Sequence, residues 1–289
     1  MPPEESLPRA AVLMAASALF FAVMGIGVKA ASHELPNSVV VFFRNAVGFA
    51  VLLPLLPRLG PGGLKTTHLA EHLVRSLAGL AAMYCFFFAI GHMRLADAVL
   101  LNYSLPLFMP MIAWLWLKEP VPSGLWRGLS VGFLGIALIL KPGLALFNPV
   151  ALAGVAAAVL AALAQVGVRR LTETEPVTRI VFYFGLISTL VSAVPLVGTW
   201  RAPPVGLWWT LLLVGISATV AQLLLTRAYA HAPAAQVGPF IYAVVPFAAL
   251  LDGLVFGQWP DPLSIAGGVL VCTAGILILR GRPTATEVT

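Results

Sequence analysis

The clearest chemical pattern in this chain is a pair of histidines one helical turn apart. His68, Glu71 and His72 fit the motif H-x-x-E-H, in which two histidines bind zinc beside a glutamate. A catalytic zinc needs a third protein ligand, and the other histidines lie in loops distant in the sequence. No Ser/His/Asp or Cys/His set stands out either. We therefore interpret the motif as the polar start of a helix, and we expect no catalytic residues, no metal site and no cofactor.

Two charged residues lie within apolar stretches, where a charge is costly and often functional. Arg44 stands well inside the stretch 37–57, and Asp252 lies toward the end of the stretch 234–257. Arg44 either serves a function or extends its side chain to the membrane surface. Asp252 either pairs with a base or carries a proton, or it is a solvated residue at a helix end. Both are candidates for a charge role, and the sequence leaves these alternatives open.

Prolines interrupt two of the apolar stretches. They are Pro106 and Pro110 in the stretch 96–117, and Pro239 and Pro246 in the stretch 234–257. A proline frees the backbone carbonyl four residues earlier, which is that of Asn102 in the first stretch and that of Tyr242 in the second. Inside a bilayer such breaks are tolerated only where they face protein or a water-filled cavity. The helix breaks therefore predict a central binding site.

Polar and aromatic side chains at these breaks and on neighbouring stretches could line that site. Polar groups cost free energy in an apolar environment unless they are hydrogen-bonded, so they should face the inside of a helix bundle. The candidate substrate-binding residues are Tyr84, Asn102, Tyr103, Gln165, Gln222 and Tyr242. Helix packing is the alternative, because small and polar residues also mediate contacts between membrane helices. We favour packing for the glycines of 123–140 and for the small residues of 149–170.

The elements that must position these residues are membrane helices. The chain is 60% hydrophobic and 10% charged, with a mean hydropathy of +0.97, whereas soluble domains carry roughly 25% charged residues. A helix needs about 20 apolar residues to span a bilayer. The composition thus predicts an all-α integral membrane protein in a lipid bilayer. Its ten transmembrane helices are expected near 10–31, 37–57, 69–91, 96–117, 123–140, 149–170, 178–199, 206–230, 234–257 and 262–280.

The basic residues indicate the membrane topology and not a nucleic-acid partner. The formal net charge is +6, but the lysines and arginines are scattered singly over loops and helix ends, without a basic stripe. With the N-terminus inside the cell, most of them fall in cytoplasmic segments, as the positive-inside rule requires. We therefore expect both termini to be cytoplasmic, with short tails at 1–9 and 282–289.

The two halves of the chain are related by an internal repeat. A shift of 140 residues places Pro106 on Pro246 and Gly128 on Gly268, without a gap. The repeats, expected at 10–141 and 149–281, each hold five helices, and this odd number inverts the second repeat in the membrane. Inverted repeats are typical of secondary transporters, because exchanging the conformations of the two halves opens the site to alternate sides. Duplication of a membrane scaffold without transport is the alternative.

The chain resembles the drug/metabolite transporter superfamily, specifically its ten-helix EamA-like branch. The resemblance rests on the five-plus-five repeat, on Arg44, on the stretch from Asp97 to Pro106, and on the segment 117–120 followed by a glycine-rich helix. Trp259 stands where the second repeat would carry the glutamate of that segment, which weakens the motif there. The resemblance implies a bacterial inner-membrane exporter that works by alternating access, similar to exporters of aromatic amino acids.

We therefore expect a secondary transporter that exports small amphipathic metabolites, amino acids including aromatic ones among them, as a monomer or weak homo-oligomer. The alternatives are a multidrug or other metabolite carrier of the same superfamily, an aqueous channel, or an integral membrane enzyme. A phosphorylated substrate would require several lysines or arginines in the cavity. Because Arg44 is the one deep candidate in this interpretation, phosphorylated substrates rank lower.

Overall fold

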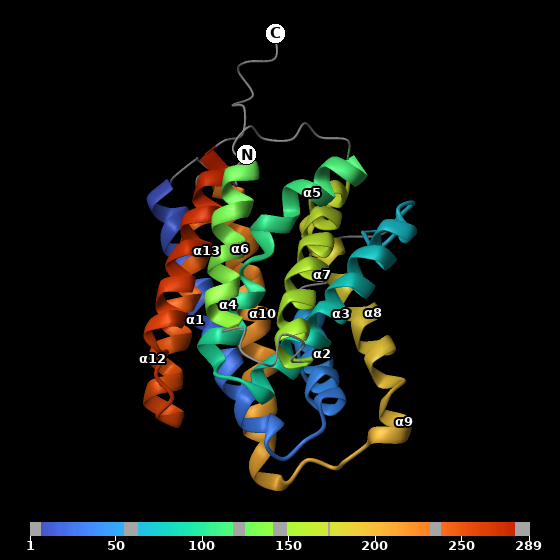
Figure 1. Cartoon of the computed structure of the whole chain (residues 1–289). Coiled ribbons are helices and arrows are strands. Elements are labelled where there is room, and N and C mark those ends of the chain that lie inside the picture. Colours follow the sequence, from blue (N-terminus) through green and yellow to red (C-terminus); the bar gives the residue numbers. More distant parts are fainter. Residues whose placement is uncertain are drawn as a thin grey trace.

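The structure is a bundle of helices that run between two ends of the molecule (Figure 1). This computed structural model describes residues 7–54, 63–117, 125–140, 149–172, 174–231 and 238–280, and these residues contain no strand. The helices are α1 (Leu7–Ser32), α2 (Asn37–Leu52), α3 (Leu69–His92), α4 (Leu95–Asn102), α5 (Leu105–Leu117), α6 (Leu125–Leu140), α7 (Pro149–Thr172), α8 (Val177–Ala193), α9 (Leu196–Thr199), η2 (Val205–Leu207), α10 (Trp208–His231), η3 (Gly238–Ala243), α12 (Val244–Phe256) and α13 (Pro262–Arg280).

The apolar helices divide evenly between the two halves of the chain. Among the residues that the structure describes, five helices are long and apolar enough to cross a membrane by length and composition, and five further apolar helices have 10–17 residues. In chain order, five of these segments lie between residues 8 and 139, and five between 149 and 274. The fold class predicted from the sequence is therefore confirmed: an all-α membrane protein with two five-helix repeats.

The second half enters the bundle from the opposite end to the first. Figure 1 shows α1 beginning and α13 finishing at one end of the bundle, called here the terminal end. The first helix of the second half, α7, begins at the other end, called here the far end. The halves are thus inverted relative to each other, as an odd number of helices in each half requires.

Helices of the two halves pack in pairs that the repeat relates. α1 packs along α10, and α3 packs along α7. The repeat relates α1 to α7 and α3 to α10. The pair α1 and α10 is therefore equivalent to the pair α7 and α3. In two more pairs, α2 with α8 and α6 with α13, each helix packs against its own equivalent in the other half. This arrangement places the interface between the halves at the centre of the bundle.

Within the described ranges, a broken helix is found in each half. α4 ends at Asn102, and α5 begins at Leu105 after a short turn. Ser104 holds this turn, since its hydroxyl donates to the carbonyl oxygen of Leu101 at 2.6 Å and its carbonyl accepts from the backbone N–H of Leu107 at 2.9 Å. The corresponding segment of the second half is the 3₁₀ helix η3, which passes directly into α12.

The prolines lie at different places relative to these breaks. Pro106 is the second residue of α5, and Pro246 is the third residue of α12. The first turn of a helix tolerates proline, because its N–H groups have no intrahelical partner. Pro239 lies within η3. Contrary to our expectation, α5 continues through Pro110, which lies just past the first turn and removes one backbone hydrogen bond without ending the helix.

Close backbone contact between α6 and α13 requires glycine. A Cβ atom added to Gly267 would lie 2.6 Å from the carbonyl oxygen of Gly135, and one added to Gly135 would lie 2.7 Å from that of Gly267. Neither carbonyl can move without displacing its helix. Small residues at such crossings let membrane helices approach closely.

Replacing Gly267 with Ala is therefore expected to lower the free energy of unfolding by about 1–3 kcal/mol, the usual cost of overpacking. The measurement is chemical unfolding of the full chain in detergent. Gly206→Ala is the matched control, because a Cβ at Gly206 meets no atom within 4 Å. Equal stability of the two variants would show that α6 and α13 can separate at little cost.

Candidate functional site

A cavity of about 170 Å³ lies between the two halves of the bundle. Pockets for drug-sized ligands typically measure about 300–1,000 Å³, so in this conformation the cavity suits a smaller molecule. Its lining comes from α1, α2, α3, α4, the break between α4 and α5, α7, α8, α10, η3 and the start of α12. The lining residues are Phe21, Met24, Arg44, Arg75, Gly79, Ala82, Met83, Phe86, Phe87, Val99, Asn102, Tyr103, Leu105, Ala161, Ala164, Gln165, Phe184, Gln222, Leu225, Ile241 and Val244.

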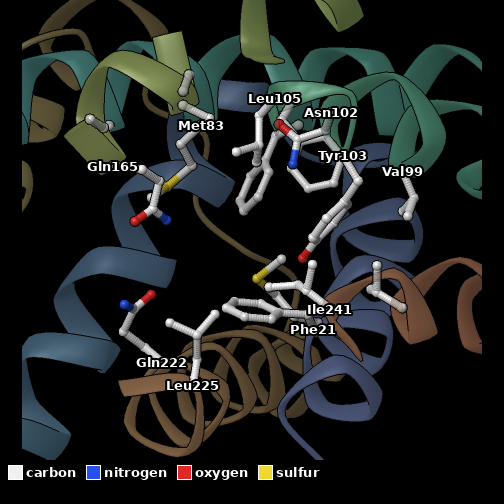
Figure 2. A pocket seen from close by; sticks show the side chains of 18 of the residues that line it. Phe21, Met83, Val99, Asn102, Tyr103, Leu105, Gln165, Gln222, Leu225 and Ile241 are labelled. Atoms are coloured by element: carbon white, nitrogen blue, oxygen red, sulfur yellow. The ribbon is translucent and has the colours of Figure 1, made fainter. Parts of the chain in front are cut away.

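Four of the polar residues proposed from the sequence lie in this cavity. Figure 2 shows Gln165 of α7 and Gln222 of α10 on one side of it, and Asn102 and Tyr103 on the other. Asn102 is the last residue of α4 and Tyr103 begins the turn, so the helix break places both side chains at the cavity. Amides and a phenol can donate and accept hydrogen bonds. Substrate binding by these four residues stays a prediction.

Aromatic rings and thioethers contribute a large part of the remaining cavity wall. Phe21 and Met24 come from α1, while Met83, Phe86 and Phe87 come from α3. Aromatic rings offer large apolar contact surfaces, and methionine adapts its shape to irregular ligands. Together with the amides and the phenol, these side chains form an amphipathic cavity.

Tyr84 and Tyr242, also proposed from the sequence, do not line the cavity. The cavity-facing residues next to Tyr242 are Ile241 and Val244, three residues apart. Ile241 lies in the 3₁₀ helix η3 and Val244 begins α12 directly after it, and residues three apart along such a tight turn lie one above the other. Tyr242 therefore points away from the cavity and packs in the apolar core. Tyr84 lies off the face of α3 that carries Met83 and Phe86, and its hydroxyl is buried with no hydrogen-bond partner among the described residues.

Arg75 is a cavity residue that the sequence interpretation missed. From the sequence alone it belongs to the basic residues that fall in cytoplasmic segments, because it lies only a few residues after residue 69, where a helix is expected to begin. In the structure it is 7% exposed and lines the cavity together with Arg44. The expectation that Arg44 is the one deep basic residue is therefore wrong. Helical spacing was the available signal, since Gly79, Ala82, Met83 and the arginine share one face of α3.

Asp252 is a buried ion-pair residue and not a solvated helix end. Its side chain is fully buried; one carboxylate oxygen accepts from the ammonium of Lys29 at 2.7 Å, and the other accepts from the backbone N–H of Leu95 at 2.8 Å. Lys29 also donates to the side chain of Gln258 at 2.6 Å. Asp252 thereby joins α12, α1 and the N-terminus of α4 at the far end, outside the cavity lining.

A second polar cluster joins the halves at the terminal end. The carboxylate of Glu175 accepts hydrogen bonds from the hydroxyl of Thr66 at 2.5 Å and from the guanidinium of Arg179 at 2.5 Å. Burial favours the neutral carboxyl, but these hydrogen bonds outweigh it and hold the pKa of Glu175 below its ordinary value. The cavity thus lies between an ionic cluster at each end of the bundle.

The H-x-x-E-H motif lies at the start of α3, apart from the cavity lining. His68 shares a hydrogen bond with the carboxylate of Glu71 at 3.1 Å, and the buried ring of His72 stacks on Tyr183 with the ring centroids 4.5 Å apart. Within the described ranges, no three His, Cys, Asp or Glu side chains gather as a metal-ligand set. The motif therefore serves packing and local hydrogen bonding there.

The fold and the cavity define a multi-pass membrane protein with two inverted repeats around a central site. The profile of the EamA-like transporter family matches residues 8–141 and again residues 148–280. The chain belongs to this family, and so to the drug/metabolite transporter superfamily. A crystal structure of another protein has the same fold, with a TM-score of 0.69 and 19% sequence identity. The match covers 96% of this chain and 100% of that chain.

Several relatives have named functions. The chain is 37% identical to "Pseudopaline exporter CntI" of Pseudomonas aeruginosa over 96% of this chain and 98% of that protein. It is 30% identical to "Riboflavin transporter" of Vibrio cholerae, over 93% of this chain and 90% of that protein. It is 27% identical to "S-adenosylmethionine uptake transporter" of Rickettsia bellii, over 85% of this chain and 84% of that protein. The chain is therefore a bacterial membrane transporter of metabolites. These three relatives are not named for aromatic amino acids, so that part of the resemblance stays a prediction.

Proposed function

We propose that this chain exports small amphipathic metabolites, amino acids including aromatic ones among them, and catalyses no reaction. The observation that carries the proposal is the cavity between the halves, which combines amides and a phenol with phenylalanines and methionines. Such a lining suits a solute with one polar and one apolar part. The exporter at 37% identity supports the outward direction.

Transport proceeds by alternating access in this proposal. Ion pairs hold both ends of the bundle: those of Asp252 and of Arg94 with Asp97 and Asp261 at the far end, and those of Glu175 with Arg179 and of Glu71 with Arg170 at the terminal end. Opening one end separates the ion pairs between the halves there while those at the other end stay intact, and the inverted halves exchange conformations. We place the terminal end in the cytoplasm and the chain in the inner membrane, in line with the distribution of basic residues.

The test is transport by the full chain in reconstituted vesicles. Vesicles are loaded in parallel with labelled phenylalanine, leucine, threonine and a cationic dye. We expect saturable flux of phenylalanine and its acceleration by unlabelled phenylalanine on the opposite side, because a carrier returns faster when loaded. Flux that rises linearly with concentration would instead identify a channel, and flux of the dye alone would identify a multidrug carrier.

A further inference from the structure

Two arginines of the cavity converge on one aromatic ring. The guanidinium carbon of Arg75 lies 3.7 Å from the ring centroid of Phe184, and that of Arg44 lies 5.7 Å from it. The three residues come from α3, α2 and α8, and all three line the cavity. Two positive charges are thus held in one small space near the middle of the bundle.

Neither charge is neutralised in the part of the chain that the structure describes. The ion pairs found there do not involve Arg44 or Arg75, and the cavity lining contains no aspartate or glutamate. Arg44 donates one hydrogen bond at 2.9 Å, to the neutral side chain of Asn45. The Nε atoms of both arginines are buried with no hydrogen-bond partner among the described residues.

Contact with Phe184 alone does not account for this arrangement. A cation over an aromatic face is stabilised only modestly, whereas burying a charge without a counter-ion is among the costliest changes in a protein. Placing two like charges near each other adds repulsion to that cost. An anion that enters the cavity during transport would relieve both effects.

We propose that Arg44 and Arg75 bind carboxylate groups of the transported metabolite, so that dicarboxylates are preferred over neutral solutes of the same shape. The inference rests on the proposed function and specifies its substrate class. A guanidinium donates two parallel hydrogen bonds to a carboxylate, and two guanidinium groups match two carboxylates. The phenylalanines and methionines of the lining then hold the apolar part of the same molecule.

The first test is binding to the purified full chain in detergent, measured by calorimetry. Benzylsuccinate and benzylsuccinamide have nearly the same shape, but the first carries two carboxylates and the second two neutral amides. We expect benzylsuccinate to bind at least about tenfold more tightly, a modest ratio for charge-assisted hydrogen bonds in a buried site. Equal affinities would overturn the proposal, and so would tighter binding of phenyl phosphate than of benzylsuccinate.

Substitutions then assign this preference to the two arginines. Arg75→Gln and Arg44→Gln are each expected to reduce the affinity ratio between the two probes to less than about threefold, and Arg75→Lys is expected to retain an intermediate ratio. Arg127→Gln is the matched control, since Arg127 is exposed on α6 outside the cavity lining. An unchanged ratio in both glutamine variants would overturn the assignment.

Thermal unfolding separates a binding role from a structural one. Each glutamine variant removes an uncompensated buried charge, so its melting temperature is expected to equal or exceed that of the wild type. A lower melting temperature with an unchanged probe ratio would show that the arginines only support the fold. If a variant fails to fold, the comparison of the two probes on the wild type still decides the substrate class.

This test is separable from that of the proposed function. Saturable phenylalanine flux combined with equal affinities for the two probes would support the proposed transport function and contradict the proposed arginine site. Preferential binding of benzylsuccinate combined with a flux that rises linearly with concentration would support the arginine site and contradict transport by alternating access.

Discussion

Asp252→Asn is expected to lower the free energy of unfolding by about 3–5 kcal/mol, because it leaves one partner of a buried ion pair charged and unpaired. That partner is the ammonium of Lys29, which is 4% exposed and lies 2.7 Å from the carboxylate. The asparagine can still accept the hydrogen bond from the backbone N–H of Leu95. The measurement is chemical unfolding of the full chain in detergent, compared with the wild type.

The double variant Lys29→Met/Asp252→Asn is the control for this prediction. It removes both charges, and replacing a whole buried pair is often neutral, so most of the lost stability should return. A double variant as unstable as Asp252→Asn would contradict the account of the pair. The same variants distinguish the roles considered for Asp252: transport that returns with stability indicates a closing contact, and transport that stays lost despite restored stability indicates a proton carrier.

Ala161→Phe is expected to reduce phenylalanine flux by about 10- to 100-fold. Ala161 lies on α7 and lines the cavity, so a phenyl ring there occupies the space that the substrate needs. A 10- to 100-fold loss corresponds to about 1.4–2.8 kcal/mol, which lies within the range of about 1–3 kcal/mol that overpacking costs. The measurement is the initial rate of counterflow in vesicles at low substrate concentration.

Val159→Phe is the matched control, because Val159 lies on the same helix and is exposed on the outside of the bundle. It adds similar bulk without entering the cavity and should leave the rate unchanged. If the two variants transport equally well, the substrate does not pass through this cavity.

The sequence alone determined the architecture, because the bilayer imposes strong constraints on it. Long apolar stretches must form helices, and an odd number of them in each repeat must invert the second one. The same constraint placed Gln165 and Gln222 toward the inside of the bundle, since amides are costly against lipid. Pro106 marked the break that brings Asn102 to the cavity.

The orientation of individual side chains depended on local geometry that an ideal helix does not represent. The segment that holds Tyr242 is a 3₁₀ helix and not an α-helix, and the different rotation per residue turns this side chain into the core while Ile241 faces the cavity. Pro110 carried the sequence signature of a break, yet α5 continues through it, because the packing of a helix can compensate for one lost hydrogen bond.

Only the tertiary structure decided the partners of the charged residues. Lys29 and Asp252 are 223 positions apart in the chain, and no local pattern relates them. Arg75 carried the sequence signature of an interfacial charge, and the packing of α3 against α8 placed it beside Arg44 in the cavity. Periodicity reports which face of a helix avoids lipid, whereas the energy of a buried charge depends on groups brought close by the fold.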